Sequence, residues 1–222
     1  MMLVLSAALA GAMHVLSGPD HMAAIAPLAL EQPKRSWLSG WTWGLGHSSG
    51  VVCVATLAVL FRGLLPPVAV ISAWGERVVG VALIGVGLWA LGRALGLASA
   101  PHAHAGQSHS HVHVRRGPAM LRRLGHAHAA FLMGIMHGVA GTSHFLGVLP
   151  ALALPTRSAS ITYILVFGAS SVVAMTGFAM CVGAAASRPS LSGPGTHRSL
   201  VMAGAAVAIF VGGVWVTGAA AP

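Results

Sequence analysis

The feature that most constrains this chain is a series of apolar segments, each long enough to cross a lipid bilayer. A transmembrane helix needs about 20 consecutive, mostly apolar residues. Six segments reach this length: residues 2–30, 36–61, 67–95, 119–154, 158–186 and 199–220. Only 7% of the 222 residues are charged, whereas a soluble domain carries roughly a quarter. We therefore expect an all-α integral membrane protein with about six transmembrane helices.

The segments 2–30 and 119–154 are longer than a bilayer requires and contain residues that interrupt helices. In the first, Gly18 loosens the helix and Pro19 cannot donate a hydrogen bond to the preceding turn. Proline suits the first position of a new helix, and an acid such as Asp20 is favoured in a first turn. The sequence predicts broken helices in both segments, with a new half-helix starting near Pro19 in the first.

Basic residues are concentrated in three of the loops between the segments. Nine of the 12 Lys and Arg lie there: Lys34, Arg35, Arg93, Arg115, Arg116, Arg122, Arg123, Arg188 and Arg198. Because basic loops remain in the cytoplasm, we expect these loops inside and both termini outside. A basic face against anionic lipid accounts for the formal charge of +9, so nucleic acid is not an expected partner.

Two parts of the chain resemble each other at an offset of 123 residues. Residues 11–30 align with residues 134–153, and the shared residues include two histidines and a proline. The identical pairs are Gly11 and Gly134, Met13 and Met136, His14 and His137, Gly18 and Gly141, His21 and His144, and Pro27 and Pro150. In the second copy Thr142 or Ser143 can cap a half-helix.

An odd number of spans separates the two copies, so the second copy enters the membrane from the opposite side. The predicted domains are a first three-helix repeat over 1–95, a His-rich cytoplasmic loop over 96–118 and a second three-helix repeat over 119–222. Inverted repeats with interrupted helices are typical of transporters, whose substrate sites lie near the bilayer midplane. The repeat therefore favours a transport function.

Ionisable side chains inside a bilayer are costly and mark functional sites. Those within the predicted spans are His14, Asp20, His21, His47, His137 and His144. In an unbroken helix His14 and His21 would lie about 10 Å apart, too far to share an ion, and the predicted break lets both approach it. Several imidazoles with one carboxylate suit Ni²⁺, Co²⁺ or Zn²⁺ rather than Mg²⁺ or Ca²⁺. We expect these six residues to form a metal site, with Asp20 neutralising the cation or coupling it to protons.

Each of these residues also has a plainer interpretation. A single histidine in a helix is more often a hydrogen-bonded packing residue, and this alternative stays open for His47 and His144 individually. Asp20 can instead cap the half-helix that follows the break. The close grouping of His14, Asp20 and His21 in the sequence favours a ligand or pathway role over these alternatives.

The predicted loop over 96–118 is rich in histidine. Its histidines are His102, His104, His109, His111 and His113. They alternate with small residues, a composition typical of metal-binding tracts, although a polar linker that gained histidines by drift would look similar. Alternation cannot preform a site, so we expect secondary metal binding by a flexible segment rather than the transport site. A further "HAH" follows at His126 and His128.

At these motifs the chain resembles the nickel/cobalt transporter superfamily, in particular its short UreH-type urease accessory proteins and NicO/RcnA-type permeases. The similar stretches are "HVLSGPDHMAAIAPL", "GWTWGLGHSSGVV", "WGERVVGVALIGVGLW", "GIMHGVAGTSHFL" and "FGASSVVAMTGFAM", and they cover most of the chain. The signature of this family is a histidine, four residues and Asp-His, whereas here five residues separate His14 from Asp20 and His21.

The resemblance implies that His14, Asp20, His21 and His47 hold a metal ion in a permease of a bacterial inner membrane. It implies Ni²⁺ or Co²⁺ as the transported substrate, and we expect neither a prosthetic group nor enzymatic activity. The other expected partners are membrane lipid, a second copy of the chain and the accessory proteins of nickel enzymes.

Two other classes of function stay open from the sequence. Membrane electron transfer would use haem between facing histidines or a thiol relay. Cys53 and Cys181 have no C-x-x-C partner and do not occupy equivalent repeat positions, so we expect them to be buried small residues. Export of sulfur compounds or amino acids on a related scaffold is disfavoured by the imidazoles, which such solutes do not need.

Overall fold

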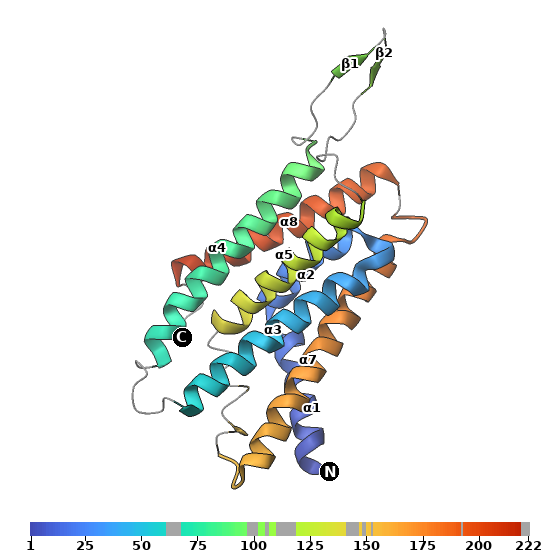
Figure 1. The fold of residues 1–222 in the computed structure, drawn as a ribbon. Coiled ribbons are helices and arrows are strands. Elements are labelled where there is room, and N and C mark those ends of the chain that lie inside the picture. The colour runs from blue at the N-terminus through green and yellow to red at the C-terminus, as the bar shows by residue number, and fades with distance from the viewer. Residues whose placement is uncertain are drawn as a thin grey trace.

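The structure, a computed structural model, describes residues 1–60, 68–96, 102–104, 107–109, 119–140, 147, 150–151, 153–191 and 193–218. Its helices are α1 (Met2–Ser17), α2 (Pro19–Glu31), the 3-10 turn η1 (Pro33–Arg35), α3 (Ser36–Leu60), α4 (Val68–Ala94), α5 (Ala119–Ala140), α7 (Arg157–Ala186) and α8 (Pro194–Thr217). They form a bundle (Figure 1). The predicted helical segments agree with α3, α4, α7 and α8 to within a few residues at each end.

Two short strands lie between α4 and α5 in the chain, within the predicted His-rich loop. They are β1 (His102–His104) and β2 (Gln107–His109), and they pair antiparallel with His102 opposite His109. Strands were not predicted there, because three-residue strands carry almost no periodic signal. His111 and His113 lie outside the described residues.

The predicted break in the first segment is confirmed. α1 ends at Ser17, Gly18 is extended with φ −86° and ψ 104°, and α2 begins at Pro19. The two helices are bent by 71° at this joint, because the proline nitrogen cannot continue the hydrogen-bond ladder of α1. The predicted break in the fourth segment follows Ala140, the last residue of α5, and lies outside the described residues.

Helices that are distant in the sequence pack against each other. α3 packs on α5 and α7, α1 packs on α7, and α4 packs on α8 (Figure 1). Two hydroxyl groups bond across these contacts: Ser48 Oγ donates to the carbonyl of Gly168 at 2.9 Å, and Ser171 Oγ donates to that of Gly11 at 3.2 Å. Such interhelical hydrogen bonds help to hold membrane helices together.

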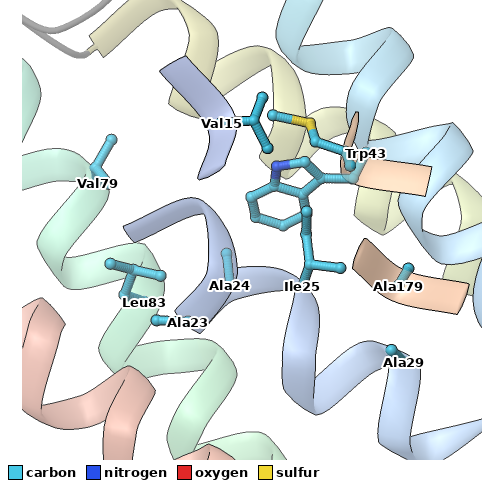
Figure 2. Packing of buried hydrophobic residues seen from close by; sticks show 10 residues of the cluster. Val15, Ala23, Ala24, Ile25, Ala29, Trp43, Val79, Leu83 and Ala179 are labelled. Carbon is cyan, nitrogen blue, oxygen red and sulfur yellow. The ribbon is translucent and has the colours of Figure 1, made fainter. Parts of the chain in front are cut away.

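A buried apolar cluster surrounds the joint between α1 and α2. Figure 2 shows Val15 of α1 and Ile25 of α2 beside the indole of Trp43 from α3. Leu83 of α4 and Met175 of α7 complete the same cluster. The joint is therefore packed on several sides by neighbouring helices, which fixes its geometry despite the interrupted hydrogen bonding.

Three described helical stretches are long and apolar enough to cross a membrane: Trp74–Ala94, Arg157–Ala186 and Pro194–Thr217. The bent pair α1 and α2 adds a fourth if it counts as one span. Large apolar side chains are exposed on the bundle, including Leu9 at 62% and Phe210 at 72%, as expected for helices that face lipid. The chain is therefore a helical membrane protein, and the number of six spans stays a prediction.

The prediction that both cysteines are buried is wrong. Cys53 and Cys181 are exposed on α3 and α7. A cysteine in an apolar helix is small and apolar enough for either a core or a lipid-facing position, and composition does not distinguish these two surroundings.

One ion pair ties the ends of two helices. Glu31 Oε1 at the end of α2 lies 2.5 Å from Arg93 Nη2 in the last turn of α4. The Arg93 guanidinium also lies 5.7 Å from the centre of the Trp89 ring. Glu31, one of the three acidic residues of the protein, thus forms an ion pair with Arg93 at the helix ends.

Candidate metal centre

The bend at Gly18 brings together the ionisable side chains of α1 and α2. The rings of His14 and His21 have centroids 4.7 Å apart in an edge-to-face arrangement, whereas a continuous helix would separate them by about 10 Å. Asp20 and His21 are buried, with 2% and 0% of their surface exposed. The interruption of the helix therefore places three ionisable groups at one point inside the bundle.

Two histidines from other helices reach the same point. His47 of α3 and His137 of α5 are buried, at 0% and 3% exposure. Their ring centroids lie 5.0 Å and 4.6 Å from that of His21. Five of the six predicted ligands therefore lie together, and they come from four helices. The sixth, His144, lies outside the described residues.

Close packing of α3 against α5 allows this convergence. Gly46 and Gly50 of α3 face the backbone of α5, and Gly134 and Gly138 of α5 face the backbone of α3. A Cβ on Gly138 would collide with the carbonyl of His47. Glycines four residues apart let membrane helices approach to backbone contact. The sequence signal for this contact is the four-residue glycine spacing in "GHSSG" and "GIMHG", which was not among the predicted features.

Asp20 uses both carboxylate oxygens within the cluster. Its Oδ1 lies 3.2 Å from His21 Nδ1, and its Oδ2 lies 2.9 Å from His137 Nε2. These contacts link the first half of the chain to the second. An N–H group on either histidine can donate to the carboxylate, which orients both imidazole rings. The alternative role of Asp20 as a helix cap is not supported, because α2 has no side-chain cap hydrogen bond.

The ligand atoms fall into two groups that share one residue. His14, His21 and His47 form one group, and Asp20, His21 and His137 form the other; within each, the candidate ligand atoms lie within 4.8 Å of one another. Imidazole and carboxylate ligands bind ions such as Zn²⁺ at about 2.0–2.2 Å, so ligand atoms on opposite sides of one ion lie about 4 Å apart. Each group can thus close around a cation with small movements of its side chains.

Aromatic side chains flank the cluster. The ring centroid of Phe167 lies 5.5 Å from that of His14, and the ring of Trp43 lies 6.0 Å from that of His137. Both aromatic residues are almost fully buried. They supply an apolar wall, which lowers the local dielectric and strengthens any bond between a cation and the ligands. Neither was among the residues singled out from the sequence.

The histidines of the predicted loop lie in a different part of the sequence from the residues of this cluster, between α4 and α5. The two short strands contain three of these histidines, His102, His104 and His109. His128 of α5 is exposed. The described residues therefore show one buried group of histidines at the joint, and the expected secondary metal binding by the loop stays a prediction.

Gly18 leaves space for neighbouring side chains and does not adopt an unusual backbone conformation. Its φ of −86° is accessible to any residue. A Cβ at this position would instead meet His21 Nδ1, and it would lie 2.8 Å from Asp20 Oδ1. From the sequence, the expected role of Gly18 is to loosen the helix. The structure shows that the missing side chain also leaves room for the two neighbouring ionisable groups.

Replacing Gly18 with alanine is expected to weaken nickel binding by about tenfold, because displaced ligand geometry typically costs 10- to 100-fold in affinity. Equilibrium dialysis of the detergent-purified variant measures this. Gly177→Ala on α7 is the matched control, since a Cβ there meets no atom within 4 Å. Unchanged affinity in Gly18→Ala would show that the ligands do not need this space.

Comparison with known proteins gives three informative matches. Chloroplast protein FOR GROWTH AND FERTILITY 2 of Arabidopsis thaliana is 32% identical over 204 residues, which are 91% of this chain and 53% of the relative. Chloroplast protein FOR GROWTH AND FERTILITY 1 is 32% identical over 205 residues, 92% of this chain and 56% of the relative. Urease accessory protein UreH of Bacillus sp. (strain TB-90) is 29% identical over 168 residues, 74% of this chain and 69% of the relative.

The chain is distantly similar to UreH. It spans about half the length of the two plant relatives that it matches. No protein-family model matches it, and no solved structure gives a significant match. The names of these relatives describe an accessory protein and two chloroplast proteins, and none describes an enzyme. The resemblance to UreH-type proteins is thus supported at the level of distant similarity.

Proposed function

We propose that this protein moves a divalent transition-metal cation, Ni²⁺ or Co²⁺, across a membrane through the cluster of His14, Asp20, His21, His47 and His137. One observation carries the proposal: four helices of a membrane protein place these side chains together, four of them buried. Ionisable side chains are rare in membrane-spanning helices and mark functional sites. Imidazoles with a single carboxylate match the ligand preference of these ions.

The packing supports an inverted repeat that builds this site from both halves of the chain. The repeat pairs α1 with α5, and with one residue deleted its register continues from "GHSSGVV" (46–52) in α3 to "GASSVVA" (168–174) in α7. In the structure α1 packs on α7 and α5 packs on α3, which are equivalent contacts under that pairing. The aligned glycines Gly11 and Gly134 each meet the backbone of the partner helix. Sites at the interface between inverted repeats are typical of secondary transporters.

Similarity to UreH supports the choice of nickel, because urease is the enzyme that this relative serves by name. Following the similarity to UreH, we propose a bacterial inner membrane, and the distribution of Lys and Arg favours basic loops in the cytoplasm. The His-rich segment then faces the cytoplasm, where it collects or delivers the ion. Partners among nickel-enzyme accessory proteins and a second copy of the chain are part of the same proposal.

The decisive experiment measures ⁶³Ni accumulation in cells with and without the protein. A rise in accumulation indicates uptake, and a fall indicates export. The difference in ⁶³Ni accumulation between cells with and without the protein is expected to fall about 30-fold or more in Asp20→Asn. Losing a contact to a charged group costs about 2–3 kcal/mol. Glu76→Gln is the matched control, because it removes another of the three acids outside the metal groups.

Equal ⁶³Ni movement in wild type and Asp20→Asn, at equal amounts of membrane-inserted protein, would contradict the assignment of the site. No difference between cells with and without the wild type would contradict transport itself. An absorption spectrum of the purified protein tests the electron-carrier alternative, because bound haem would give a strong Soret band.

A further inference from the structure

We propose that the transported cation has two alternative positions in the cluster, which share His21 and are occupied one at a time. The carboxylate position is formed by Asp20, His21 and His137. The imidazole position is formed by His14, His21 and His47. The proposal rests on the proposed function and describes the steps that the ion takes within that site.

Distances separate the two positions. Each group of three has all its candidate ligand atoms within 4.8 Å of one another, and the five residues form two such groups. His47 and His137 belong to different groups, and neither group contains both. An ion bonded at about 2.0–2.2 Å to every ligand can close one group, whereas drawing in all five side chains would require larger shifts of the helices.

The shared histidine makes the two positions mutually exclusive. A neutral imidazole has one ring nitrogen with a free lone pair, and the other nitrogen carries a proton. His21 therefore binds one ion at a time. Its ring stands at 81°, 85° and 77° to those of His14, His47 and His137, with centroids 4.6–5.0 Å away. It is placed between the two groups, where a small rotation transfers the ion from one to the other.

Charge and burial give the two positions different roles. The carboxylate position holds the only acid of the cluster, and its three side chains are at most 3% exposed. The imidazole position has no negative charge, and His14 is only partly buried. A cation in a low-dielectric interior is stabilised by a nearby carboxylate. We therefore assign the carboxylate position as the resting position and the imidazole position as the step through which the ion enters or leaves.

The test compares equilibrium nickel affinity with ⁶³Ni flux in single variants. His137→Ala is expected to weaken binding by about tenfold, within the range for a disturbed metal shell, because the ion falls back on the imidazole position. His47→Ala and His14→Ala are expected to lower flux by at least about tenfold, with a change in affinity below about threefold. His128→Ala, an exposed histidine on the same helix as His137, is the control.

X-ray absorption on the nickel-loaded proteins provides a second readout. The multiple scattering from imidazole rings is expected to stay at two rings in His47→Ala and to rise to three in Asp20→Ala, as the ion moves to the imidazole position. One ion per chain at the cluster is expected throughout. Equal losses of affinity in His14→Ala, His47→Ala and His137→Ala would overturn the two positions in favour of one site, while transport would stand. A wild type that neither binds nor moves nickel would instead contradict the proposed function.

Discussion

Replacing His21 with alanine is expected to abolish nickel transport and to weaken equilibrium binding more than any other single change in the cluster. A four-ligand zinc site contributes about 10–16 kcal/mol of binding free energy. Each ligand is then worth about 3 kcal/mol, or about 150-fold in affinity. His21 belongs to both groups of ligand atoms, so its loss leaves no intact group to which the ion can move. Equilibrium dialysis and ⁶³Ni flux on the same preparation measure the two effects.

The comparison with His137→Ala makes this result specific. That variant removes a ligand from one group only, so its loss of affinity is limited by the group that remains. His21→Ala should therefore bind nickel at least about tenfold more weakly than His137→Ala. His21→Ala must also be shown to insert in the membrane, by protease protection, and to fold, by its elution as a single peak in size-exclusion chromatography. Retained binding in His21→Ala would remove this residue from the site.

Replacing Gly138 with leucine is expected to prevent the stable packing of α5 on α3. A Cβ at this position would overlap the carbonyl oxygen and carbon of His47, and a backbone cannot move aside as a flexible side chain can. Overpacking of this kind costs about 3 kcal/mol or more, a large fraction of the stability of most proteins. Thermal unfolding in detergent, followed by circular dichroism, measures the loss, and nickel binding should fall with it because His47 and His137 separate.

Gly177→Leu on α7 is the control for this prediction. A Cβ at Gly177 meets no atom within 4 Å, so the leucine adds apolar surface without a collision. The two variants have the same change in composition and helix propensity. Equal thermal stability in both would show that α3 and α5 do not approach to backbone contact at Gly138.

Local chemistry made the joint of α1 and α2 predictable. Gly18 and Pro19 specify an interruption through the backbone alone, and neighbouring helices do not change that requirement. The choice of candidate ligands followed from the cost of ionisable groups in lipid, which is a property of single residues. His14, Asp20, His21 and His47 could be selected on this ground, and the repeat added His137.

The arrangement of these residues could not be predicted in the same way. The division into two groups depends on distances between helices, which are set by contacts such as those of Gly46 and Gly138. The places of Trp43 and Phe167 beside the cluster depend on helix rotation, and an apolar helix in lipid has no polar face to reveal it. The same ambiguity explains the wrong prediction that Cys53 and Cys181 are buried.

The pairing of Glu31 with Arg93 has an electrical consequence. The chain has three acids, one is engaged by that arginine, and Asp20 alone belongs to the metal groups. Under the proposed function, a divalent ion that leaves Asp20 without another acid carries two uncompensated charges through the electric field of the membrane. Each charge is worth about 2.3 kcal/mol per 100 mV, so such a potential alone supports a concentration ratio of about 10³. A voltage negative on the cytoplasmic side then favours inward movement without a nucleotide as energy source.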